Sequence, residues 1–110
     1  MVNCTHYTYR VSWSEDDEEF VALCTEFPSL SFLSKTHIKA LVGVLELVEE
    51  VVADMAKSGE EIPPPISYKK FSGKFQVRIP PKQHRELFIE AREEGVSLNR
   101  HVSRKLQACG

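Results

Sequence analysis

Residues 74–81 read Lys-Phe-Gln-Val-Arg-Ile-Pro-Pro, and this stretch decides the fold of the second half of the chain. Polar and apolar side chains alternate up to Ile79, which is the period of a strand with one buried face. The polar face carries Lys74, Gln76 and Arg78, and these side-chain types bond base edges in the DNA major groove. We therefore predict that these three residues read DNA bases, although six alternating residues also fit an ordinary edge strand with a solvated face.

The residues after this strand predict two helices. The pair Pro80-Pro81 ends the strand and suits the first turn of a helix that runs to Glu94. Gly95 suits a left-handed C-cap, and Ser97 suits the N-cap of a second helix. One strand and two helices in so short a segment bury too little apolar surface to fold alone, which predicts an intertwined dimer with paired strands.

The start of the second helix predicts a phosphate site. The backbone N–H groups of Leu98, Asn99 and Arg100 open a helix N-terminus, which is a ready site for an anion such as a DNA phosphate. The side chains of Asn99 and Arg100 can add contacts. The predicted phosphate-binding residues are Ser97, Leu98, Asn99 and Arg100.

Charge divides the chain into an acidic and a basic part, although the net charge is only −2. Residues 1–71 hold six Lys or Arg against twelve Asp or Glu, a balance of −6, whereas residues 72–110 hold eight against four, a balance of +4. A basic segment that also carries the base-reading pattern fits contact with phosphates. Chance can also divide charge unevenly in a short chain.

The acidic segment predicts a small sheet covered by one helix. Its expected elements are strands at residues 7–13, 20–24 and 30–33, a helix at residues 36–57 and a returning strand at residues 66–71. Ser34 or Thr36 suits the start of the helix, and Gly59 suits its end. The fold class is therefore α+β, with a βββαβ domain at residues 1–71 and a strand–helix–helix domain at residues 72–110.

The predicted helix at residues 36–57 has more apolar surface than one sheet face needs. Its polar stripe is narrow, whereas a helix that covers a sheet needs an apolar stripe only roughly 100° wide. We expect the excess apolar surface to pack on a second copy of this domain or on the C-terminal domain.

The residue patterns predict no catalytic or metal site. Asp16 and Asp17 sit in a run of acidic residues, which is typical of a solvated turn rather than of a metal site. His6 and His37 lie at the edges of predicted elements, and no motif places a nucleophile beside either of them. We therefore expect no catalytic residue, no metal and no cofactor, and the chain is not predicted to be an enzyme.

The cysteines and the hydropathy pattern predict a cytoplasmic protein. Cys4, Cys24 and Cys109 are odd in number, widely spaced and without a CxxC motif, which favours free thiols in a reducing compartment. No apolar run approaches the roughly 18 residues of a membrane span. Residues 1–10 lack the pattern of a signal peptide.

Two parts of the chain resemble known families. Residues 74–80 and Gly95-Val96-Ser97-Leu98-Asn99, with the spacing between them, resemble the ribbon-helix-helix fold of bacterial and phage repressors over about a third of the chain. The Tyr-x-Tyr-x-Val-x-Trp strand, residues 20–28, the long helix and Gly59-Glu60-x-Ile62-Pro63 resemble the N-terminal domain of HicB antitoxins. Together these resemblances describe HicB proteins whose DNA-binding domain is ribbon-helix-helix.

This resemblance implies a partial ribonuclease-H-like fold for the N-terminal domain, which would bind and block a small HicA-type ribonuclease toxin. It implies that a C-terminal homodimer binds double-stranded operator DNA and represses the toxin–antitoxin operon. A tetramer through the N-terminal domain is a further option, because the predicted long helix has excess apolar surface. The chain departs from the family at Ser34-Lys35-Thr36, which stands in place of a glycine-rich turn.

Two alternatives stay open. One is a stand-alone transcription regulator whose N-terminal domain serves oligomerisation or another protein contact. The other is a ribonuclease-H-like enzyme that uses Asp16 and Asp17.

Overall fold

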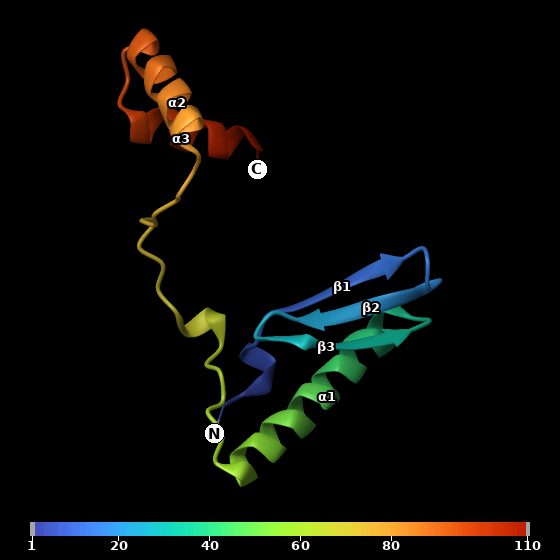
Figure 1. Cartoon of the computed structure of the whole chain (residues 1–110). Helices are drawn as coiled ribbons and strands as arrows, with labels where there is room; N and C mark the ends of the chain where they lie inside the picture. Colours follow the sequence, from blue (N-terminus) through green and yellow to red (C-terminus); the bar gives the residue numbers. More distant parts are fainter. Residues whose placement is uncertain (1, 110) are drawn as a thin grey trace. The chain divides into compact units, whose positions relative to one another are not determined.

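The structure is a computed structural model that describes residues 2–109, and the chain divides into two compact units between Ser72 and Gly73. In the first unit, the short 3₁₀ turn Cys4–His6 precedes strands β1 (Tyr9–Ser14), β2 (Glu19–Cys24) and β3 (Phe27–Ser34), helix α1 (His37–Ser58) and a second 3₁₀ turn, Ile66–Tyr68 (Figure 1). The second unit holds helices α2 (Pro81–Glu94) and α3 (Leu98–Cys109). The predicted α+β class is confirmed.

The sheet is a three-stranded antiparallel meander in the order β1-β2-β3. The predicted hairpin of the first two strands forms, and Glu18 takes a positive φ of 52° in the turn between them. β3 begins at Phe27, earlier than expected, and contains Pro28. An edge strand tolerates proline because one of its edges needs no ladder donor, and the pairing is irregular opposite Leu23 and Cys24.

Helix α1 has the predicted position and caps. The Thr36 hydroxyl accepts the Lys39 N–H at 3.2 Å, and Gly59 ends the helix in the left-handed region at φ 71°. The buried residues Ala40, Val44, Val48 and Val52 recur every four positions, which places them along one face of the helix.

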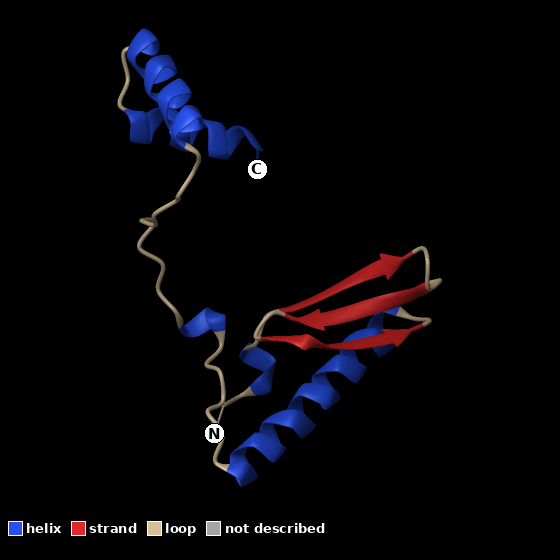
Figure 2. Ribbon diagram, viewed as in Figure 1, coloured by secondary structure: helices blue, strands red, loops and turns tan. Residues whose placement is uncertain are grey.

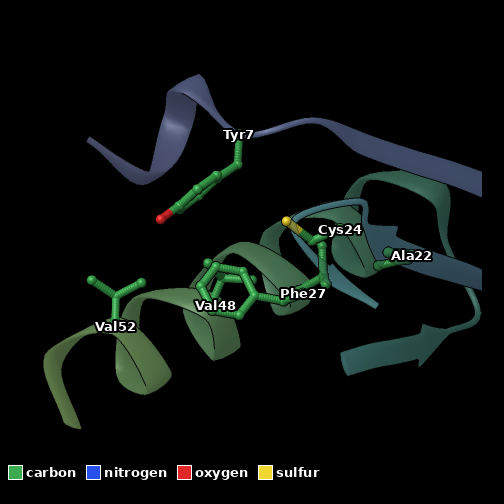
Figure 3. Packing of buried hydrophobic residues seen from close by; sticks show 8 residues of the cluster. Tyr7, Ala22, Cys24, Phe27, Val48 and Val52 are labelled. Carbon is green, nitrogen blue, oxygen red and sulfur yellow. The ribbon is translucent and has the colours of Figure 1, made fainter. Parts of the chain in front are cut away.

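One core joins this helix face to the sheet (Figures 2 and 3). Ala22 and Cys24 of β2 and Phe27 of β3 pack in the core with α1. The Tyr7 ring extends from the segment before β1 toward α1, meets the Phe27 ring edge-on at 5.3 Å, and its hydroxyl donates to the Pro63 carbonyl at 2.7 Å. The N-terminal unit therefore buries its own core within one chain.

The predicted fourth strand at residues 66–71 was wrong. Ile66–Tyr68 is a 3₁₀ turn, and Lys69 to Phe71 lie outside the sheet. The backbone N–H groups bond elsewhere than to a strand: the Ile66 N–H donates to the Glu26 carboxylate at 2.8 Å, and the Tyr68 and Lys69 N–H groups donate to the Pro65 and Ile66 carbonyls. Among the described residues, the order of regular elements in this unit is βββα rather than βββαβ.

The C-terminal unit is a pair of helices. α2 begins with Pro81 at its first position and ends at Gly95, which has a φ of 70°, and α3 follows after a short turn. Residues 74–79 form no strand in the single chain. Because the predicted ribbon requires the same strand of a second copy, strand pairing stays a prediction.

Candidate functional site

The N-terminus of α3 presents backbone donors. The Ser97 hydroxyl accepts the Arg100 N–H at 3.1 Å, which makes Ser97 the cap of this helix. The N–H groups of Leu98 and Asn99 lie in the first turn, where no intrahelical acceptor exists. Asn99 and Arg100 are exposed. The structure thus brings the four predicted phosphate-binding residues to one helix start, with the Arg100 amide engaged by the cap.

The three predicted base-reading residues lie on an exposed, extended segment. Lys74, Gln76 and Arg78 all face solvent. The alternate residues Phe75 and Val77, predicted to face a core, are also 73% and 65% exposed. Within one chain this segment therefore has two exposed faces, one polar and one apolar.

Further exposed apolar groups of this unit lie on its two helices. Phe88 and Ile89 of α2 and Leu106 of α3 are about half exposed. Pro81, His84, Arg85 and Phe88 line a shallow hollow on α2. The unit thus buries little apolar surface, at Ala91, and leaves several of its large apolar side chains exposed.

A buried histidine links the two helices, and the sequence reasoning missed it. His101 is 5% exposed, and its Nδ1 lies 3.1 Å from a carboxylate oxygen of Glu94. Its Nε2 lies 3.6 Å from Glu90, too far for a hydrogen bond, and finds no hydrogen-bond partner among the described residues. Lys105 approaches Glu90 at 3.5 Å. These contacts hold α2 against α3 and so fix the turn that presents Ser97.

The connector after α1 is fastened to the N-terminal unit by side chains that no sequence motif marked. Glu26 accepts the N–H groups of Thr8 at 2.9 Å and Ile66 at 2.8 Å. Burial alone would raise the pKa of the Glu26 carboxyl, but these donated hydrogen bonds outweigh it and lower that pKa below its ordinary value. The Tyr68 hydroxyl pairs with His6 Nδ1 at 2.5 Å. The connector therefore has a defined path as far as Tyr68.

The acidic and histidine side chains considered for catalysis do not converge. Asp16 and Asp17 are exposed on the β1–β2 turn, where Asp17 accepts the Ser14 hydroxyl at 2.8 Å. The His37 ring packs edge-on against Phe20. Within residues 2–109, no group of three or more His, Cys, Asp or Glu side chains is placed to hold a metal ion.

Two of the cysteines can be placed. Cys4 and Cys24 are free thiols, and burial raises the pKa of both, which keeps them protonated and weakly nucleophilic near neutral pH. The side chain of Cys109 lies outside the described residues. None of the helices in residues 2–109 has the length and apolarity that a membrane crossing requires.

A comparison with protein-family models finds one relationship. Residues 57–106 match the HicB family. The matched stretch runs from the end of α1 to α3 and leaves β1, β2 and β3 outside it. No curated protein and no solved structure matches the chain. The match supports a relationship of residues 57–106, a little under half of the chain, to the HicB family.

Proposed function

We propose that this chain is a HicB-like antitoxin that binds operator DNA through a dimeric ribbon-helix-helix and neutralises a HicA-type toxin through its N-terminal unit. In this proposal the protein acts in the cytoplasm by binding and is not an enzyme. The DNA-binding part rests on one observation about residues 74–78. The apolar side chains of this segment are exposed in the single chain, and they alternate with polar side chains of the types that bond DNA bases.

A second copy accounts for the exposed apolar side chains. Antiparallel pairing of residues 74–79 between two copies satisfies one backbone edge of each strand. It gathers Phe75 and Val77 of both copies on one face of the ribbon, where exposed α2 residues such as Phe88 can cover them. The other face then carries Lys74, Gln76 and Arg78 from each copy, a two-stranded ribbon that fits the major groove.

The remaining features support the same arrangement. The start of α3 supplies the Leu98 and Asn99 amides for backbone phosphates, with Arg100 beside them. The balance of +4 over residues 72–110 favours DNA, whereas the balance of −6 over residues 1–71 favours a basic protein such as a small ribonuclease. The HicB family match supports the pairing of these two tasks in one chain.

Operator binding tests the DNA-reading face. Replacing Lys74, Gln76 and Arg78 by alanine should abolish specific binding to the DNA upstream of the chain's own gene, measured by gel shift, while the dimer stays folded. Lys39→Ala with Lys57→Ala, which removes two exposed cations of the N-terminal unit, is the control and should bind normally. Unchanged affinity in the triple variant would refute the assigned face.

Salt dependence tests the phosphate contacts. If a dimer neutralises about six to ten phosphates, its affinity should fall roughly 10³- to 10⁵-fold between 50 and 200 mM salt. A flat response would contradict phosphate-dominated binding.

A stand-alone regulator is the second candidate. It is favoured by the exposed apolar residues at the start of α1, which can serve assembly of tetramers, and by Ser34-Lys35-Thr36 at the position of a glycine-rich turn. The neighbouring reading frame separates the two candidates. A small basic toxin-like gene beside this one favours the antitoxin, and its absence favours the regulator.

A further inference from the structure

The basic part of the chain begins before the boundary between the two units. Residues 62–85 hold six Lys or Arg and no Asp or Glu, which makes them the longest stretch of the chain without an acidic residue. Residues 1–61 hold four Lys or Arg against twelve Asp or Glu, a balance of −8. The charge therefore changes sign in the connector after α1, and Lys69 and Lys70 of the N-terminal unit belong to the basic segment.

Lys69 and Lys70 are exposed, and their charge is not neutralised within the chain. Among the described residues, no carboxylate lies within ion-pair distance of either ammonium group. The Lys69 Nζ lies 5.3 Å from the centroid of the Phe71 ring, which is itself 72% exposed. The backbone is extended at Lys69 and forms no helix or strand from there to α2 within the described residues (Figure 1). Such a segment attracts a polyanion.

The connector is fixed to the N-terminal unit immediately before these lysines. The Ser67 hydroxyl donates to the His6 carbonyl at 2.8 Å, and the Tyr68 hydroxyl pairs with Nδ1 of the same histidine. Lys70 follows Tyr68 by two positions and precedes Lys74 by four. Because a trans chain spans at most about 3.6 Å per residue, the Cα atoms of Lys70 and Lys74 lie within about 14 Å of each other.

This spacing fits the phosphates of a DNA strand. Each strand of B-DNA carries a phosphate about every 3.4 Å along the helix axis, so about 14 Å of chain extends over roughly four phosphates. With Lys74 in the major groove, as in the proposed function, Lys69 and Lys70 are within reach of the backbone that borders that groove. A lysine ammonium is a compact charge that binds phosphate without reading the base.

We propose that Lys69 and Lys70 bind backbone phosphates of duplex DNA beyond the base pairs that residues 74–78 contact. The inference rests on the proposed function and deepens it, because it extends the DNA-binding surface into the connector of the N-terminal unit. A dimer then has four phosphate-binding cations that lie outside the ribbon and outside α2 and α3. The N-terminal unit takes part in DNA binding through the end of its connector.

The acidic part of the chain is the other candidate ligand for these lysines. Residues 1–61 carry the opposite charge, yet neither lysine meets one of their carboxylates in the part of the chain that the structure describes. A single exposed ion pair stabilises little. Each lysine bound to DNA, in contrast, releases condensed counterions. Duplex DNA is therefore the favoured ligand.

Neutral replacements of the two lysines test the phosphate contacts. Binding of the full-length chain to the duplex upstream of its own gene is measured by fluorescence anisotropy between about 50 and 200 mM salt. Lys69→Gln with Lys70→Gln should weaken binding about tenfold or more near 100 mM salt. The slope of log K against log salt should become less steep by about 3 to 4, since a dimer loses four contacts at about 0.9 each.

A matched pair of lysines on α1 is the control. Lys39 and Lys57 are exposed and, among the described residues, also form no ion pair. Lys39→Gln with Lys57→Gln therefore makes an equal charge change elsewhere on the N-terminal unit, and it should leave both the affinity and the slope unchanged. An equal loss in this control would show that net charge alone is responsible and would overturn the inference.

Contacts to phosphates should leave the sequence preference intact. The ratio of operator affinity to scrambled-duplex affinity should stay within about twofold of the wild-type value in Lys69→Gln with Lys70→Gln. Alanine at Lys74, Gln76 and Arg78 should instead remove that preference. A changed ratio in the variant with both lysines replaced would assign them to base contacts and overturn the phosphate assignment.

Shortening the DNA tests the same contacts in the wild-type chain. Removing the base pairs that flank the sequence-specific part of the duplex should weaken wild-type binding about tenfold, because the phosphates for Lys69 and Lys70 are lost. The same shortening should change the affinity of Lys69→Gln with Lys70→Gln by no more than about twofold. Equal wild-type affinity for the long and the shortened duplex overturns the inference, even where the variant loses the Trp13 fluorescence of the folded chain.

The remaining outcomes separate this inference from the proposed function. Wild-type binding to the operator with an unchanged affinity and slope in Lys69→Gln with Lys70→Gln overturns the inference and leaves the proposed function standing. If the wild-type chain does not bind the operator, both are overturned together.

Discussion

The two units of this chain differ in how they use their apolar residues. In the N-terminal unit, Val44 and Val48 of α1 are fully buried against the sheet, and one chain completes the core. In the C-terminal unit, buried apolar surface is limited to residues such as Ala91, while Phe75 and Val77 face solvent. The first unit buries its apolar residues within one chain, whereas the second exposes apolar residues that the proposed dimer would bury. Stability and assembly should therefore depend on different residues in each.

The largest expected effect concerns assembly. Phe75→Asp with Val77→Asp should abolish the dimer and unfold the C-terminal unit, because the charges would occupy the shared core. Sedimentation and circular dichroism measure these losses. Trp13 is the single tryptophan, so its fluorescence reports unfolding of the N-terminal unit. The free energy of unfolding measured by this signal should stay within about 0.5 kcal/mol of the wild-type value.

Protein concentration sharpens the same contrast in the wild type. Unfolding of the C-terminal unit should shift to higher denaturant as concentration rises, whereas the Trp13 signal should not shift. If the unfolding midpoints of both units shifted equally with protein concentration, the two units would not differ in their dependence on a second copy.

The second effect concerns a close contact between α1 and β3 in the N-terminal unit. A Cβ built at Gly43 of α1 would lie 2.2 Å from the Phe32 ring of β3. Gly43→Ala should therefore lower the free energy of unfolding by about 1–3 kcal/mol, as overpacking does, measured by urea unfolding of the Trp13 signal.

The sign of this effect should reverse when the ring is absent. In a Phe32→Ala background, Gly43→Ala should raise stability by about 1 kcal/mol, because alanine favours a helix interior over glycine. The same sign in both backgrounds would show that the ring moves aside without cost.

The third effect compares the two N-caps. Thr36→Ala and Ser97→Ala should each cost about 1 kcal/mol of stability, the first in the N-terminal unit and the second in the C-terminal unit. Only Ser97→Ala should also weaken operator binding, because its helix start faces phosphate in the proposed complex. Weaker operator binding by Thr36→Ala would contradict this division.

The smallest effect is a pH dependence confined to the N-terminal unit. The lowered pKa of Glu26 means that its ionised form is favoured by folding, so its contribution is present above the ordinary carboxyl pKa of about 4.3 and is lost as pH falls through the lowered value. Glu26→Gln should cost less than about 1 kcal/mol at neutral pH, since the site is partly exposed. It should also reduce the loss of unfolding free energy at acidic pH, measured by the Trp13 signal. An unchanged loss at acidic pH would assign the acid sensitivity to another group.

Elements whose signals are local could be predicted from the sequence. The Thr36 cap and Gly59 end delimit α1 within one residue of the expected range, and Gly95 ends α2 as its lack of a Cβ allows. The alternating residues 66–71 failed as a strand because Glu26, forty positions earlier, binds the Ile66 amide, and no local pattern reports such a contact. The same limit hid the burial of His101 against α2.

The candidate site is harder to predict for a different reason. In a single chain both faces of residues 74–79 are exposed, and only the proposed pairing with a second copy would separate an apolar from a polar face. The side-chain types of Lys74, Gln76 and Arg78 are readable from the sequence, whereas their spacing across a groove depends on pairing between two copies.

The close approach of Phe32 to Gly43 also sets the rotation of α1 about its own axis. Glycine is the one residue that lets the ring rest against the helix backbone, and Gly43 is the only glycine within α1. Turning the helix by one residue, about 100°, would place a side chain beneath the ring. Gly43 therefore fixes the rotation of α1 against the sheet. By fixing which side of the helix meets the sheet, it also fixes which side, with Ile38 and Val42, is left exposed to solvent.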